Sequence, residues 1–139
     1  MHVRVDPNSL VPPSQQLVAS VLDAIASGEL RPGDKLPSVR GLAADALVNP
    51  NTVAKAFRDL EHLGATAGRN GSGVYVTAAA PDVAKGLRLA ETLADVRTAG
   101  QHALRAGHDE QVLRDVVTDA VRSAMRSNRE RNEGERSRA

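Results

Sequence analysis

The sequence contains no cysteine and almost no aromatic residues. Without cysteine the chain can form neither a disulfide framework nor a thiolate metal site, and it has no cysteine nucleophile. Phe57 and Tyr75 are the only aromatic residues, so leucine, valine, isoleucine and alanine must fill the core. The 139 residues suit one compact domain or two small modules. At this size, further burial through dimerisation would add stability.

Long apolar runs are also missing. The first ten residues hold no continuous apolar segment, so we expect no signal peptide. No stretch approaches the roughly 18 apolar residues that a membrane-spanning helix needs. We therefore expect a cytoplasmic protein with no membrane partner.

Neither sign of charge is in large excess. The formal net charge is +1, well short of the basic balance typical of dedicated nucleic-acid-binding proteins. Residues 1–77 carry seven basic and seven acidic side chains: Arg4, Arg31, Lys35, Arg40, Lys55, Arg58 and Arg69 against Asp6, Asp23, Glu29, Asp34, Asp45, Asp59 and Glu61. Any argument for DNA binding must therefore rest on where individual charges lie.

Patterns typical of enzymes and metal sites are absent as well. His2, His62, His102 and His108 do not have the spacing of metal ligands. There is no P-loop and no G-x-S-x-G motif. We predict that the protein is not an enzyme and uses no metal and no cofactor.

The first half of the chain has the element order of a winged helix-turn-helix. Apolar spacing predicts helices over 14–27, 39–46 and 50–63. A β-hairpin over 65–77 follows, because Asn70-Gly71 is a strong turn signal and the residues after it favour strands. Ser14, Ser38 and Asn49 are candidate N-caps. The predicted core residues are Leu36, Leu42, Val53, Phe57, Leu60 and Tyr75. We assign residues 1–77 to this domain.

The remaining chain is predicted to form two helices, over 82–106 and 109–128. They make up a dimerisation segment over 78–130, so the fold class is mainly α with one small β-hairpin. The apolar stripe of the second helix is too wide for one partner helix to cover, which favours a symmetric homodimer. The predicted dimer contacts are Leu87, Ala90, Leu93, Leu113, Val116, Val117 and Val121. A pocket at the dimer seam for an unidentified small-molecule effector stays open. Residues 131–139, almost all charged or polar, are predicted to be a disordered tail.

The residues around the third helix suit DNA. A helix N-terminus attracts phosphates, and Asn and Thr side chains can contact bases or phosphates. The candidates on these grounds are Arg40, Asn49, Asn51, Thr52, Lys55, Arg58 and Arg69. On spacing alone, a near-neutral module of this kind can equally be a protein–protein interaction domain without DNA binding. That alternative gains if Asp45, Asp59 and Glu61 line the exposed face of the third helix.

Two segments closely resemble the GntR family of bacterial transcriptional regulators: LRPGDKLPSVRGLA (30–43) and VNPNTVAKAFRDLE (48–61). The run GSGVYV (71–76) fits the wing motif of the family, and the likeness covers about residues 10–77. The run VNPNTV and the short C-terminal part look like the YtrA subfamily. Ser14 stands where the family usually has an aromatic residue, and Ala65 where it has a large aliphatic one, so we expect a thinner core or first wing strand.

The resemblance implies a DNA-binding regulator, most simply a repressor, that binds an inverted repeat in double-stranded DNA as a homodimer. Subfamily members commonly repress operons for ABC transporters, often with their own gene. It also implies DNA contacts by Arg40, by the residues that open the third helix and by the wing. The complete predicted set is Ser38, Arg40, Asn49, Pro50, Asn51, Thr52, Lys55, Arg58, Arg69, Asn70, Gly71 and Ser72.

Overall fold

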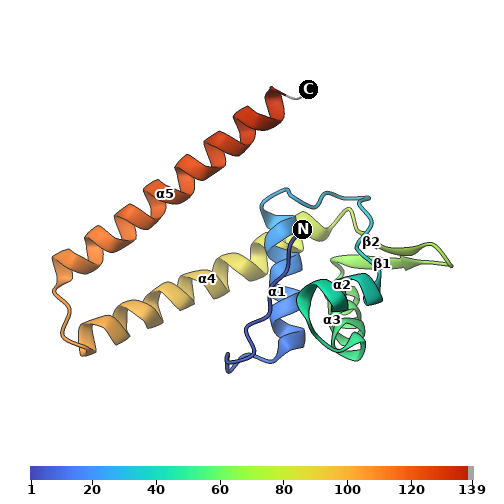
Figure 1. The fold of residues 1–139 in the computed structure, drawn as a ribbon. Coiled ribbons are helices and arrows are strands. Elements are labelled where there is room, and N and C mark those ends of the chain that lie inside the picture. The colour runs from blue at the N-terminus through green and yellow to red at the C-terminus, as the bar shows by residue number, and fades with distance from the viewer. Residues whose placement is uncertain (138–139) are drawn as a thin grey trace. The chain divides into compact units, whose positions relative to one another are not determined.

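The computed structural model describes residues 1–137, except for the side chains of Asn128, Arg131, Asn132 and Glu135. It contains five helices and one two-stranded antiparallel sheet (Figure 1). The elements are α1 (Pro13–Ala26), α2 (Val39–Ala46), α3 (Pro50–His62), β1 (Thr66–Arg69), β2 (Gly73–Val76), α4 (Ala80–Arg105) and α5 (Glu110–Arg136). The predicted fold class is confirmed. The chain divides into two compact units, Met1–Thr92 and Leu93–Ala139.

The first unit is built around α3, which packs against α1, α2 and β1. Its core consists mainly of aliphatic side chains, and Leu17, Leu42 and Leu60 are almost completely buried. Leu36, Val53 and Phe57 are buried as predicted. The prediction of Tyr75 as a core residue is wrong. This side chain lies on the outer face of the hairpin and is only partly buried.

Helix starts follow from local side-chain chemistry. The backbone N–H of Gly41 donates to Ser38 Oγ at 3.0 Å, and that of Asn51 donates to Asn49 Oδ1 at 2.8 Å. These two predicted N-caps are confirmed. Ser14 is not an N-cap, because α1 begins one residue earlier at Pro13, where proline needs no N–H partner. Ser14 is instead buried in the first turn.

The wing contains more than the two strands of the sheet. In the hairpin, Thr66 faces Val76 and Arg69 faces Gly73. The segment around Lys35 runs along the far side of β2: Leu36 N–H donates to the Val74 carbonyl at 2.8 Å, and Val76 N–H donates to the Asp34 carbonyl at 2.9 Å. The loop after α1 therefore joins the wing as a short third chain segment. Figure 1 shows the hairpin projecting from the helices of this unit.

One buried polar group in the wing leads to a stability prediction. The Thr66 hydroxyl is buried and has no hydrogen-bond partner among the residues that the structure describes. Thr66→Val removes this group and keeps the shape and β-branching, so we expect the free energy of unfolding to rise by about 1 kcal/mol. Urea unfolding followed by circular dichroism measures it. Thr77→Val is the matched control. The Thr77 hydroxyl donates to the Gly64 carbonyl at 2.6 Å, so the same change there should lower stability by about 1 kcal/mol. A loss of stability in Thr66→Val would contradict the prediction.

The first part of α4 belongs to the first unit. Ala80 and Ala84 are fully buried against the winged-helix core. Leu87 is partly buried against the same core, and its predicted dimer contact stays a prediction. The compact unit therefore extends to Thr92, beyond the predicted boundary at residue 77, because these side chains continue the packing past the hairpin.

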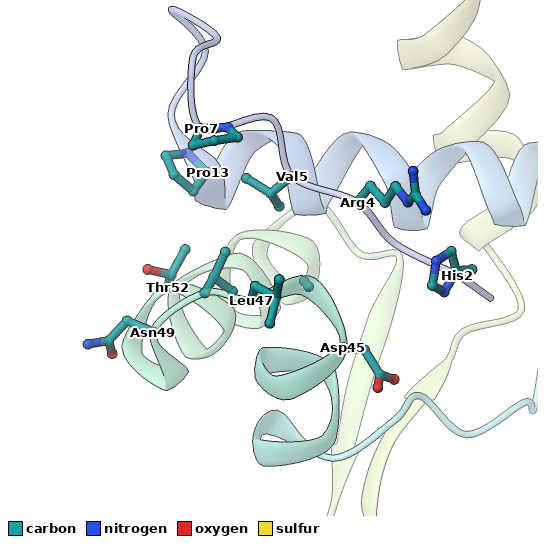
Figure 2. A pocket seen from close by; sticks show the side chains of 11 residues that line it. His2, Arg4, Val5, Pro7, Pro13, Asp45, Leu47, Asn49 and Thr52 are labelled. Carbon is teal, nitrogen blue, oxygen red and sulfur yellow. The ribbon is translucent and has the colours of Figure 1, made fainter.

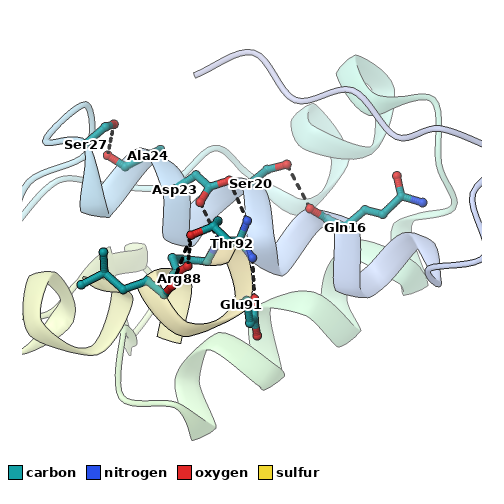
Figure 3. A network of polar contacts seen from close by, with 9 residues as sticks. Gln16, Ser20, Asp23, Ala24, Ser27, Arg88, Glu91 and Thr92 are labelled. Atoms are coloured by element: carbon teal, nitrogen blue, oxygen red, sulfur yellow. Dashed lines mark hydrogen bonds and ion pairs between the residues drawn. The ribbon is translucent and has the colours of Figure 1, made fainter. Parts of the chain in front are cut away.

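An ion-pair network also holds α4 on α1 (Figure 3). Arg88 Nε and Nη2 lie 2.6 and 3.2 Å from the two carboxylate oxygens of Asp23, and Arg88 Nη1 pairs with Glu91. The hydrogen bond with Asp23 raises the pKa of Arg88 above its ordinary value, so the guanidinium keeps its charge. Because Asp23 is 55% exposed, water screens the pair, and we expect it to contribute at most about 1 kcal/mol. Its consequence is local: it ties the first part of α4 to α1 within the first unit.

The second unit contains the rest of α4 and α5. Asp109 caps α5 by accepting from Gln111 N–H at 2.8 Å, as expected for the turn at Gly107 and His108. The helix continues to Arg136. The prediction of disorder is wrong for residues 131–136, which are helical. Arg and Glu are good helix formers, and no proline interrupts this segment. Residues 138–139 of the predicted tail lie outside the described residues.

Apolar side chains cover much of the second unit's surface. Beyond their turn, α4 and α5 make almost no contact with each other within the described residues. Leu93, Val116, Val117 and Val121 are between 51% and 59% exposed as a result. No helix of the described residues is long and apolar enough to cross a membrane.

Candidate nucleic-acid interface

The exposed face of α3 carries polar and basic side chains. Asn51, Lys55, Arg58 and His62 follow one another at intervals of four, three and four residues, which places them on one side of a helix. All four are exposed, whereas Val53, Phe57 and Leu60 bury the opposite side. α3 therefore presents a continuous stripe from its capped N-terminus to its end, with Thr52 partly buried beside it.

The acidic residues do not occupy this stripe. At 100° per residue, Asp59 and Glu61 lie about 70° and 90° from its centre, on opposite sides. Asp59 Oδ2 pairs with Lys55 Nζ at 2.9 Å and so partly neutralises that lysine. Glu61 turns toward the hairpin, where Gly68 N–H donates to its Oε1 at 3.4 Å. This arrangement favours a DNA-binding face over the protein-interaction alternative.

Asp45 is the third acidic residue whose position bears on DNA binding, and it lies on another part of the surface. It lines a pocket of about 660 Å³ between the N-terminal segment and the turn from α2 to α3 (Figure 2). Leu47 also lines it, 92% exposed and in the left-handed conformation at φ 55°. The sequence did not predict this pocket, which lies within the winged-helix unit. No local pattern marks it, since the N-terminal arm forms one wall. The pocket left open at a dimer seam stays a prediction.

The predicted contact residues at the helix starts have two kinds of role. Ser38 and Asn49 use their side-chain oxygens as caps, while the amide nitrogen of Asn49 points outward in Figure 2. Arg40, the second residue of α2, is exposed, and no carboxylate of the described chain lies within ion-pair distance of it. Pro50 occupies the first turn of α3. Arg40 and the start of α3 are thus available to a partner.

The outer face of the wing collects a second set of residues. The Arg69 guanidinium lies 4.3 Å from the centre of the Tyr75 ring. Ser72 Oγ is 2.6 Å from Tyr75 Oη, at hydrogen-bond distance. Asn70 and Gly71 form the exposed turn, where Gly71 has φ 68°, a conformation that favours glycine. The predicted wing residues are therefore brought together at one tip.

Comparison with known proteins agrees with this arrangement. Residues 13–76 match the family model of bacterial regulatory proteins, gntR family. The solved structure of YtrA from Sulfolobus acidocaldarius, a GntR-family transcription factor, is 32% identical to this chain. The alignment covers 68% of this chain and 99% of that one, with a TM-score of 0.54. The chain belongs to the GntR family.

Two further similar proteins extend the comparison. The HTH-type transcriptional repressor YtrA of Bacillus subtilis (strain 168) is 40% identical over 75 residues, which are 54% of this chain and 58% of that protein. The chain thus spans little more than half the length of this relative. The structure of AraR(DBD) in complex with operator ORX1 is 26% identical, covers 55% of this chain and 99% of that one, and has a TM-score of 0.51. The resemblance predicted from the sequence is confirmed.

Proposed function

We propose that this protein is a sequence-specific DNA-binding transcriptional regulator and not an enzyme. The observation that carries the proposal is the exposed stripe of α3, on which Asn51 is followed by the basic side chains of Lys55 and Arg58. A solved relative with this fold is bound to an operator. The match of shape and residue types supports the same kind of partner for this chain.

We propose different roles for the parts of this interface. A recognition helix enters the major groove with its N-terminal residues against base edges, so Asn51 and Thr52 read bases. Arg58 and Arg40 reach phosphates or base edges beside them. The wing tip at Asn70, with Arg69 before it, contacts the flanking groove. Phosphate contacts set the register on the duplex, and base contacts provide the sequence preference.

We further propose that a second copy of the chain covers the exposed apolar surface of α4 and α5. Single apolar side chains on a surface are common, but a row of them along a helix marks an interface. A symmetric dimer would present two α3 helices to an inverted repeat, with half-sites about one helical turn apart or a multiple of it. The B. subtilis relative is a repressor. We propose that this protein is also a repressor. We propose further that it controls a transporter operon that includes the gene for this protein.

The test is a titration of the purified protein against the duplex upstream of its own gene, with an unrelated duplex as control, at physiological salt. We expect saturable binding to the first and at least about a thousandfold weaker binding to the second. Equal, weak binding to both would contradict the proposal. In that case the winged helix would be an interaction module for another protein.

A further inference from the structure

We propose that Lys35 is a further DNA-contacting residue. Together with Arg69, it contacts an operator phosphate on the outer face of the wing. This inference rests on the proposed function. It adds a residue that the sequence pattern did not single out, because Lys35 stands in a turn-rich segment outside the hairpin and the recognition helix. The occupant of this face is the backbone of the same duplex that α3 contacts.

Strand geometry places Lys35 on the outer face. The segment 34–36 pairs with β2, and Lys35 lies opposite Tyr75. Successive side chains of an extended segment point to opposite faces. Leu36 and Val76 point inward and are 2% and 3% exposed, so their neighbours Lys35 and Tyr75 point outward. Lys35 is exposed accordingly.

Gly73 provides the space in which the lysine lies. A Cβ built at position 73 would be 2.7 Å from Lys35 Cε and 3.5 Å from Lys35 Nζ. The Lys35 stem therefore crosses the strand directly over the glycine. Gly73 also has φ 126°, a conformation that side chains disfavour. The glycine thus lets the ammonium reach across β2 toward the wing tip.

Arg69 approaches the same area from the other strand. It faces Gly73 in the hairpin register and lies over the Tyr75 ring. Two cations, Lys35 and Arg69, therefore border the glycine on one face. The Tyr75 ring restricts the motion of the Arg69 guanidinium. The guanidinium therefore loses less conformational entropy when it binds an anion.

Nearby carboxylates are directed elsewhere. Asp34 Oδ2 accepts from the backbone N–H of Arg31 at 2.8 Å. Glu61 reaches Gly68 N–H, and Gly68 pairs with Val74, whose side chain packs on the inner side. Within the described part of the chain, no carboxylate lies at ion-pair distance from Lys35 or Arg69. Two such cations on one face of the wing suit a phosphate, and the duplex would release counterions when they bind it.

The experiment compares Lys35→Gln with Lys85→Gln in operator titrations over a range of salt concentrations. Both variants lose one lysine charge, and Lys85 is an exposed residue of α4, so it is the matched control. For Lys35→Gln we expect roughly tenfold weaker binding to the operator and the unrelated duplex alike. The slope of log affinity against log salt should fall by about one per bound subunit. Lys85→Gln should behave as the unaltered protein, and Lys35→Arg should restore binding.

The outcomes separate this inference from the proposed function. The inference alone would be overturned if the unaltered protein prefers its operator and Lys35→Gln has the same affinity and salt slope. Unaltered protein that binds no duplex would overturn the proposed function and the inference together. A loss limited to the operator would overturn the phosphate assignment, because a phosphate contact weakens binding to every sequence. Circular dichroism should show the same melting curve for the variants, since position 35 is exposed.

Discussion

Replacing Val117 and Val121 with glutamate should disrupt the proposed dimer and weaken operator binding at least about a hundredfold. Both valines are a little more than half exposed on α5. Carboxylates placed in an apolar interface lose hydration without gaining a partner, so the dimer becomes unfavourable. A monomer then binds one half-site without the benefit of the second. Linkage of two binding modules commonly raises affinity by about 10²–10⁴.

Analytical ultracentrifugation measures the oligomeric state, and operator titration measures the functional loss. Arg122→Glu is the control. Arg122 is exposed on the opposite side of α5, and its replacement changes more charge than either valine substitution does. This control should remain a dimer with nearly unchanged affinity. A double-glutamate variant that stays dimeric would show that the dimer contact lies outside this stripe.

Arg40→Ala should lower the binding free energy for the operator by about 1–3 kcal/mol per subunit. Arg40 is exposed at the start of α2 and has no ion-pair partner in the described chain. Its removal therefore costs the fold little, and the loss reports on the DNA contact. Arg40→Lys keeps the charge but not the planar fork of donors, so it should recover only part of the affinity if the contact is bidentate.

Fluorescence anisotropy with a labelled operator duplex is a suitable measurement. Arg97→Ala, at an exposed site on α4, is the matched control and should bind as the unaltered protein does. A loss of less than a few tenths of a kcal/mol in Arg40→Ala would remove Arg40 from the interface. The proposed interface would then rest on the α3 stripe and the wing.

Local sequence determined most of the helices, two of the helix caps and the hairpin turn of this protein. Ser38 and Asn49 cap helices because a short side-chain oxygen reaches N–H groups two or three residues ahead. Asn70-Gly71 turns the chain because glycine accepts a positive φ. The spacing of Val53, Phe57 and Leu60 identified the buried side of α3, and with it the exposed side. Each of these features depends on residues a few positions apart.

Only the tertiary structure decided which residues from distant segments meet. Tyr75 faces outward because the hairpin register turns Val76 toward the core, and a change of one residue in register would reverse both. Lys35 joins the wing because its segment pairs with β2. Asp23 and Arg88, 65 residues apart, bring α4 onto α1 and extend the first unit to Thr92. Pairing and packing between such segments depend on the whole fold, so no pattern of neighbouring residues predicts them.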